Sequence, residues 1–130
     1  MSILKLVPAF KDYLWGGEKL KTDYHKNTTL VPLAESWELS YHKDGLTKLE
    51  NGKTLQESLP KEALGKNATA FEFFPVLTKF IDAKDNLSVQ VHPSDEFALK
   101  NEGQFGKCEM WYIMDAEPGA GLYLGLERAF

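Results

Sequence analysis

The most informative segment of the sequence is Leu87-Ser88-Val89-Gln90-Val91-His92-Pro93. Its alternation of apolar and polar residues predicts a β-strand, because successive side chains of a strand point to opposite faces. One face of this strand would be apolar, and the other would carry Ser88, Gln90 and His92. For this segment alone, the simplest interpretation is a half-buried strand whose polar face meets water.

A second predicted strand, Lys107 to Asp115, changes that interpretation. Lys107, Glu109 and Trp111 would share one face, and the alternating residues between them would form the other. Both faces carry large apolar groups, so neither is typical of a freely hydrated strand. A carboxylate there needs a partner. The partner of Glu109 could be a metal ion, or it could be Lys107, which lies two residues away on the same face.

Together the two strands offer three metal-binding groups of different chemistry. These are the imidazole of His92, the carboxylate of Glu109 and the amide oxygen of Gln90. They can converge if both strands line the inside of a small barrel. Imidazole and carboxylate ligands suit zinc, iron, nickel or manganese. The residues therefore predict a candidate metal site whose metal is left open.

The rest of the chain predicts a mainly β fold with a few short helices. Further strands are expected over residues 3–7, 34–41, 77–83 and 121–126. Short helices are expected over residues 18–24, 54–59, 61–64 and 94–100. Many short strands separated by turn signals favour a sandwich or barrel over a parallel sheet. The last ten residues are strand-like and apolar, so we expect residues 1–130 to be part of one larger domain without an internal boundary.

Composition narrows the class of protein. The chain has 130 residues, of which 43% are hydrophobic, enough to form a core. Its net charge of −4 argues against a nucleic-acid partner, which requires clustered Lys and Arg. Cys108 is the only cysteine, which excludes an intramolecular disulfide and a cysteine-rich zinc ribbon. Without a signal-peptide pattern or about 18 consecutive apolar residues, we expect a cytoplasmic protein and no membrane partner.

Four short motifs give the chain a family resemblance. They are Trp15-Gly16-Gly17, Ala34-Glu35-Ser36-Trp37, Ser88-Val89-Gln90-Val91-His92-Pro93 and Gly106-Lys107-Cys108-Glu109-Met110-Trp111-Tyr112, in that order. In these motifs the sequence resembles the N-terminal portion of type I mannose-6-phosphate isomerase in its short bacterial form. The resemblance covers nearly the whole chain, and the last two motifs are specific as a pair.

The resemblance implies a zinc-dependent enzyme with a cupin-like jelly-roll barrel, incomplete in this chain. The enzyme would interconvert mannose 6-phosphate and fructose 6-phosphate. By resemblance, Gln90, His92 and Glu109 are ligands of Zn²⁺. A further His ligand and the catalytic residues of the family would lie beyond residue 130, because His25 and His42 occupy no matching motif.

The same resemblance assigns residues to the sugar-phosphate substrate. Trp15 and Glu35 of the two early motifs match residues of the active-site wall, and Ser88 and Lys107 match residues of the two later motifs. Other roles stay open for some of them: Lys107 could serve as the ion-pair partner of Glu109, and Trp15 could be a packing anchor.

Two other functions remain possible from the sequence. The first is a non-catalytic truncated cupin that binds metal or sugar phosphate weakly, or that self-associates into a homo-oligomer through unfinished sheet edges. The second is an iron oxygenase. That class uses two His and one carboxylate, and the matched motifs supply only one His, so it is disfavoured.

Overall fold

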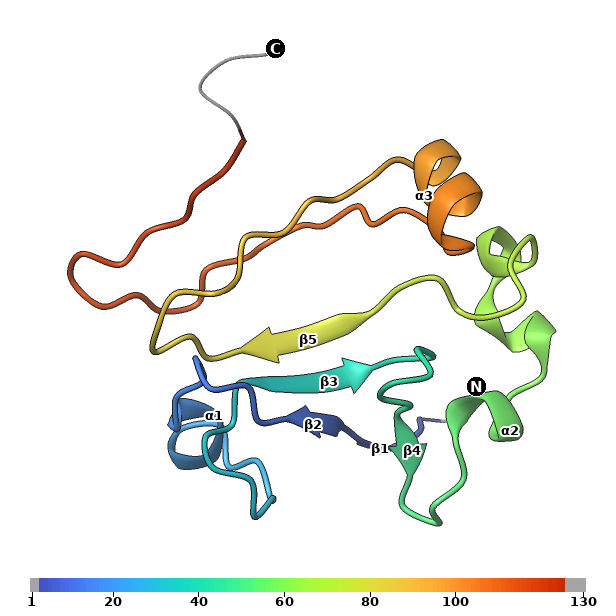
Figure 1. The fold of residues 1–130 in the computed structure, drawn as a ribbon. Helices are drawn as coiled ribbons and strands as arrows, with labels where there is room; N and C mark the ends of the chain where they lie inside the picture. Colours follow the sequence, from blue (N-terminus) through green and yellow to red (C-terminus); the bar gives the residue numbers. More distant parts are fainter. Residues whose placement is uncertain (1–2, 126–130) are drawn as a thin grey trace. The chain divides into compact units, whose positions relative to one another are not determined.

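A computed structural model describes residues 3–125 and divides the chain into two compact units, Met1–Ser88 and Val89–Phe130 (Figure 1). The prediction that residues 1–130 are part of one larger domain without an internal boundary is not tested by this division and stays a prediction. The strands are β1 (Leu6–Val7), β2 (Ala9–Lys11), β3 (Glu35–Leu39), β4 (Lys48–Leu49) and β5 (Thr78–Ile81). The helices are α1 (Lys19–Thr22), α2 (Leu55–Ser58), the 3-10 turns η1 (Lys61–Leu64) and η2 (Lys66–Ala68), and α3 (Asp95–Glu102).

The first unit is built around a three-stranded antiparallel sheet in which β3 lies between β2 and β5 (Figure 1). Ser36 on β3 is opposite Phe10 on one side and Phe80 on the other. A second, two-stranded sheet pairs β1 with β4. The strands predicted over residues 34–41 and 77–83 are thus confirmed over their central residues, as β3 and β5, and the strand predicted over residues 3–7 is confirmed only at its end, as β1. Among residues 3–125 neither sheet closes into a barrel.

The core of the first unit lies where β3 begins. Leu33, Ala34 and Trp37 are buried there, and Leu20 of α1 and Leu55 of α2 are buried as well. The loop at Gly16 and Gly17 approaches this point so closely that a Cβ on Gly16 would lie 2.6 Å from the Cα of Ala34. The turn predicted at Trp15-Gly16-Gly17 is present just before this contact. Only glycine permits such close backbone approach.

Side-chain caps fix the ends of the short helices. Thr54 and Glu57 form a reciprocal capping box at α2, and Ser94 accepts a hydrogen bond from the Phe97 amide at the start of α3. Both caps were predicted from the sequence pattern. The cap of α1 was not, because it comes from a distant residue: the Lys19 amide donates to the Asp82 carboxylate at 2.7 Å.

The strands predicted in the second unit are wrong for the described residues. Residues 89–92, 107–115 and 121–125 contain no strand, and neither do Leu87 and Ser88 at the end of the first unit; position 126 lies outside the described residues. Residues 89–93 and 107–113 are instead extended segments without a hydrogen-bonded ladder (Figure 1). The physical reason is that strands persist through pairing and a covered face, and an isolated two-stranded ribbon is marginal in water.

Candidate metal and substrate site

The two extended segments of the second unit bring His92 and Glu109 into contact. The His92 Nε2 atom lies 2.8 Å from Glu109 Oε2, and the two side chains are 27% and 24% exposed. Sixteen residues of sequence, including α3, lie between them. A hydrogen bond of 2.8 Å from the Gly106 amide to Asp95 Oδ1 joins the two segments at the end of the loop. The pair predicted from two separate motifs therefore forms one cluster.

Lys107 and Trp111 complete the surroundings of the Glu109 carboxylate. Lys107 Nζ lies 2.5 Å from Oε1, and the Trp111 indole donates to Oε2 at 3.2 Å. Residues 107, 109 and 111 thus point to the same side, as the predicted alternation requires. The ion pair weighed as the alternative partner of Glu109 is also present.

These neighbours keep the Glu109 carboxylate ionised. Partial burial raises the pKa of Glu109, but hydrogen bonds from Lys107 and Trp111, together with the charges of Lys107 and His92, outweigh burial and lower the pKa from 4.5 to about 2. A carboxylate must be ionised to bind a cation. Glu109 is therefore in the chemical state that a metal ligand needs.

The donor set fits a zinc ion. Two tetrahedral ligand atoms about 2.0 Å from zinc lie about 3.3 Å apart, so His92 and Glu109 would need to separate only by about half an ångström from 2.8 Å. Gln90 lies two residues before His92 and is exposed. Among residues 3–125 the Gln90 amide makes no hydrogen bond to His92 or Glu109, and no group of three or more His, Cys, Asp or Glu side chains is placed to hold a metal ion. The structure thus brings two of the three predicted ligands together.

Trp15, Glu35 and Ser88, the other residues predicted from the motifs, belong to the first unit. Ser88 is exposed, and Trp15 is half-buried with its ring stacked on Tyr13 at 5.5 Å between centroids. The Trp15 carbonyl accepts hydrogen bonds from the Lys84 and Asp85 amides. Burial, followed by the charge of Glu35, raises the pKa of Tyr13. The stacked pair therefore lies within electrostatic reach of Glu35.

Glu35 is the most deeply placed of these residues. It is 5% exposed, and its Oε2 atom accepts a hydrogen bond of 2.6 Å from the Trp37 indole. Lys79 Nζ lies 3.2 Å from both carboxylate oxygens. Register explains the cluster: Lys79 on β5 is directly opposite Trp37 on β3. Both oxygens of Glu35 are engaged inside the unit.

Two lysines beside this cluster were missed by the sequence reasoning. Lys79 lies 5.2 Å and Lys11 lies 4.6 Å from the Trp37 ring centroid. Lys11 on β2 is opposite Glu35 on β3. One face of the sheet therefore holds two ammonium groups around a buried carboxylate and an indole. For Lys79 the available signal was its position within the strand predicted over residues 77–83, where an isolated charge needs a partner. Lys11 lies outside the predicted strands, so the sequence pattern offered no such signal for it.

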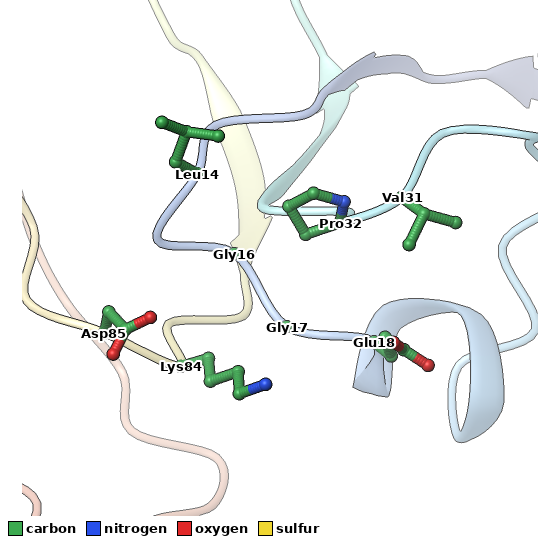
Figure 2. A pocket seen from close by; sticks show the side chains of 8 residues that line it. All are labelled: Leu14, Gly16, Gly17, Glu18, Val31, Pro32, Lys84 and Asp85. Carbon is green, nitrogen blue, oxygen red and sulfur yellow. The ribbon is translucent and has the colours of Figure 1, made fainter.

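A shallow pocket of about 250 Å³ lies elsewhere in the first unit (Figure 2). In that view Lys84 and Asp85 lie on one side of the Gly16–Gly17 backbone, and Leu14 and Pro32 lie on the other. Val31 and Glu18 complete its lining. Gly16 and Gly17 of the first motif also line it, but none of the predicted metal ligands or substrate-binding residues does, so this pocket is not the candidate site.

Comparison with known proteins gives the family. Residues 3–118 match the catalytic domain of phosphomannose isomerase type I. Mannose-6-phosphate isomerase of Streptococcus mutans is 35% identical over 122 residues, which are 88% of this chain and 37% of that protein. Mannose-6-phosphate isomerase ManA of Bacillus subtilis is 36% identical over 123 residues, which are 91% of this chain and 39% of that protein.

A solved structure shows the same relationship. The crystal structure of the mannose 6-phosphate isomerase from Bacillus subtilis superposes with a TM-score of 0.67 at 33% identity, covering 79% of this chain and 34% of that one. This likeness confirms the predicted fold class, a mainly β, cupin-like fold whose sheets do not close within residues 3–125. The chain spans about two-fifths of the length of the curated relatives that it matches. With its family match over residues 3–118, the chain belongs to the type I phosphomannose isomerase family.

Proposed function

We propose that this chain supplies part of the active site of a zinc-dependent isomerase that interconverts mannose 6-phosphate and fructose 6-phosphate. The observation that carries the proposal is the contact between His92 and Glu109, 2.8 Å apart and both largely shielded from water. Relatives that share 35–36% identity with the chain are named for this activity. The four motifs singled out from the sequence all lie within the matched range, residues 3–118.

In this proposal His92, Glu109 and Gln90 hold the zinc ion. His92 and Glu109 already face each other, and Gln90 lies two residues before His92 on the same extended segment. A bound zinc ion would supply positive charge that lowers the cost of developing negative charge on the sugar oxygens. Zinc with these three protein ligands, or with a fourth from the further His that the resemblance implies, can keep a coordination position open for substrate or water.

Lys107 has two tasks in this proposal. Its ammonium group holds one oxygen of Glu109 at 2.5 Å, which leaves the other oxygen toward His92. The Lys107 side chain is 46% exposed, so it also has donors free to meet a sugar oxygen or a phosphate. The reaction itself moves a proton between C1 and C2 of the sugar, through an enediol, and needs a general base whose pKa lies near neutrality.

Trp15, Ser88 and Glu35 are proposed to serve the substrate side. The half-buried Trp15 ring offers an apolar wall, and the exposed Ser88 offers a hydroxyl donor. Glu35 acts indirectly, because its buried carboxylate holds the Lys79 ammonium in place beside Trp37. A fixed ammonium is a suitable contact for a phosphate or a sugar hydroxyl.

A chimera tests this function directly. Residues 1–130 would replace the matched part of Bacillus subtilis ManA, and isomerisation of mannose 6-phosphate would be measured with and without zinc. We expect zinc-dependent turnover, a loss of at least 100-fold in His92→Ala and Glu109→Ala, and little change in His25→Asn, which removes an exposed histidine outside the motifs. A folded chimera without turnover, or with turnover insensitive to both ligand substitutions, would refute the proposal.

A further inference from the structure

Tyr13 lies beside two of the residues proposed for the substrate side, Trp15 and Glu35, although none of the four motifs includes it. Its ring stacks on that of Trp15, with 5.5 Å between the centroids and 27° between the ring planes. The Gly16 amide donates a hydrogen bond of 2.9 Å to the Tyr13 carbonyl, which closes the turn that carries both rings. Because Gly16 also approaches Ala34 closely, this turn is fixed at the start of β3.

The Tyr13 hydroxyl lies in a negative electrostatic environment. Burial raises the pKa of Tyr13 above the ordinary value of 10, and three carboxylate charges raise it further. The carboxylates are those of Glu35, Asp44 and Asp12, which act through their charge and accept no hydrogen bond from the hydroxyl. The hydroxyl therefore stays protonated at neutral pH, where it is a neutral group that can both donate and accept a hydrogen bond.

This setting suits the neutral part of a sugar phosphate better than its phosphate group. The three negative charges near Tyr13 disfavour a phosphate at this hydroxyl. A sugar hydroxyl carries no charge, and it can exchange hydrogen bonds with the tyrosine hydroxyl in either direction. The stacked rings of Tyr13 and Trp15 also offer apolar area against which the C–H groups of a sugar ring can pack.

We propose that Tyr13 is a substrate-binding residue whose hydroxyl bonds a neutral hydroxyl group of the hexose, while the stacked Tyr13–Trp15 pair supports the C–H face of the sugar. The inference rests on the proposed function in its choice of substrate. It adds a residue that recognises the sugar rather than the phosphate. Tyr13 takes no part in the proton transfer, so losing its hydroxyl should weaken binding and leave the chemical step nearly unchanged.

Substitution of Tyr13 in the zinc-loaded chimera with Bacillus subtilis ManA tests this contact. Tyr13→Phe keeps the stacked ring and removes only the hydroxyl. Calorimetry would use an equilibrated mixture of mannose 6-phosphate and fructose 6-phosphate, which gives no net heat of reaction. We expect the affinity to fall about three- to tenfold, as for one uncharged hydrogen bond, and the affinity for inorganic phosphate to change less than twofold. KM should rise by the same factor as the affinity falls, with kcat changed less than twofold.

Tyr24→Phe is the matched control. The Tyr24 ring packs against Phe80, with 5.8 Å between the centroids. Phe80 is next to Lys79 on β5, so it points to the sheet face opposite to that of Lys79 and Glu35. Removing the Tyr24 hydroxyl should therefore change each of these quantities less than twofold. Circular dichroism and the urea midpoint would establish that both variants fold.

Any of four results would overturn the inference. They are an affinity for the sugar phosphates that stays within twofold in Tyr13→Phe, an equal loss for inorganic phosphate, the same loss in Tyr24→Phe, and a fall in kcat at constant KM. Turnover of the parent chimera is a separate readout. A chimera that isomerises but ignores Tyr13→Phe refutes this inference alone, whereas a chimera that binds the sugar phosphates through Tyr13 but does not isomerise them counts against the proposed function alone.

Discussion

Removing the Lys79 ammonium should destabilise the first unit strongly, because it leaves a buried negative charge without its partner. The Glu35 side chain is 7% exposed and that of Lys79 is 19% exposed, with 3.2 Å between the charged atoms. In Lys79→Met the aliphatic stem keeps its packing while the ammonium is lost. Breaking a buried ion pair from one side costs about 3–5 kcal/mol. The Trp37 indole would still donate to Glu35, so we expect a loss of about 3 kcal/mol.

Urea unfolding followed by circular dichroism measures this loss. With a slope of about 1–3 kcal/mol per molar urea, the midpoint should fall by about 1–3 M. The double variant Glu35→Gln/Lys79→Met also removes the unpaired carboxylate charge and should be more stable than Lys79→Met alone. Lys43→Met, at an exposed lysine, should stay within about 0.5 kcal/mol of the parent. A cost below about 1 kcal/mol, with no recovery in the double variant, would refute the reasoning.

Two further outcomes follow from the backbone and the caps. Gly16→Ala should lower the free energy of unfolding by about 1–3 kcal/mol, because its Cβ would collide with Ala34, whereas Gly121→Ala, with open space around it, should be neutral; equal effects in urea unfolding would contradict this. Hydrogen bonds from the Thr54 amide and hydroxyl lower the pKa of Glu57 below 4.5, so the capping box contributes stability above the ordinary pKa of Glu and loses it as the pH falls through the lowered value. The Thr54 amide shift in NMR should therefore titrate below pH 4.5 and stay flat in Glu57→Gln; a titration that persists in the variant would contradict the assignment.

Local signals in the sequence predicted much of the first unit and the start of α3 in the second. The capping box of α2 and the Ser94 cap of α3 depend on residues three positions apart, so the pattern alone is sufficient. The central residues of β3 and β5 were likewise predicted from alternation and turn signals. The pattern could not predict contacts between residues far apart in the sequence, such as the cap of α1 by Asp82 or the ion pair of Lys79 with Glu35.

The second unit shows the limit of periodicity. The alternation at 107, 109 and 111 correctly placed three side chains on one side, as their shared contacts demonstrate. Yet no strand forms there within the described residues, because a ladder depends on partners that the segment cannot specify by itself. Likewise, the motifs predicted that His92 and Glu109 would meet, while the place of Gln90 in the site stays a prediction.

Zinc binding to the purified chain tests the central claim most directly. Equilibrium titration with a zinc-specific fluorescent competitor should show one site per chain, weakened at least tenfold by His92→Ala and by Glu109→Ala. Cys108→Ser removes the exposed thiol, the other strong zinc-binding group close to Glu109 in sequence, and should leave the affinity unchanged. If the affinity instead follows Cys108 and ignores both His92 and Glu109, the pair is an ordinary hydrogen-bonded contact and the proposed metal site is wrong.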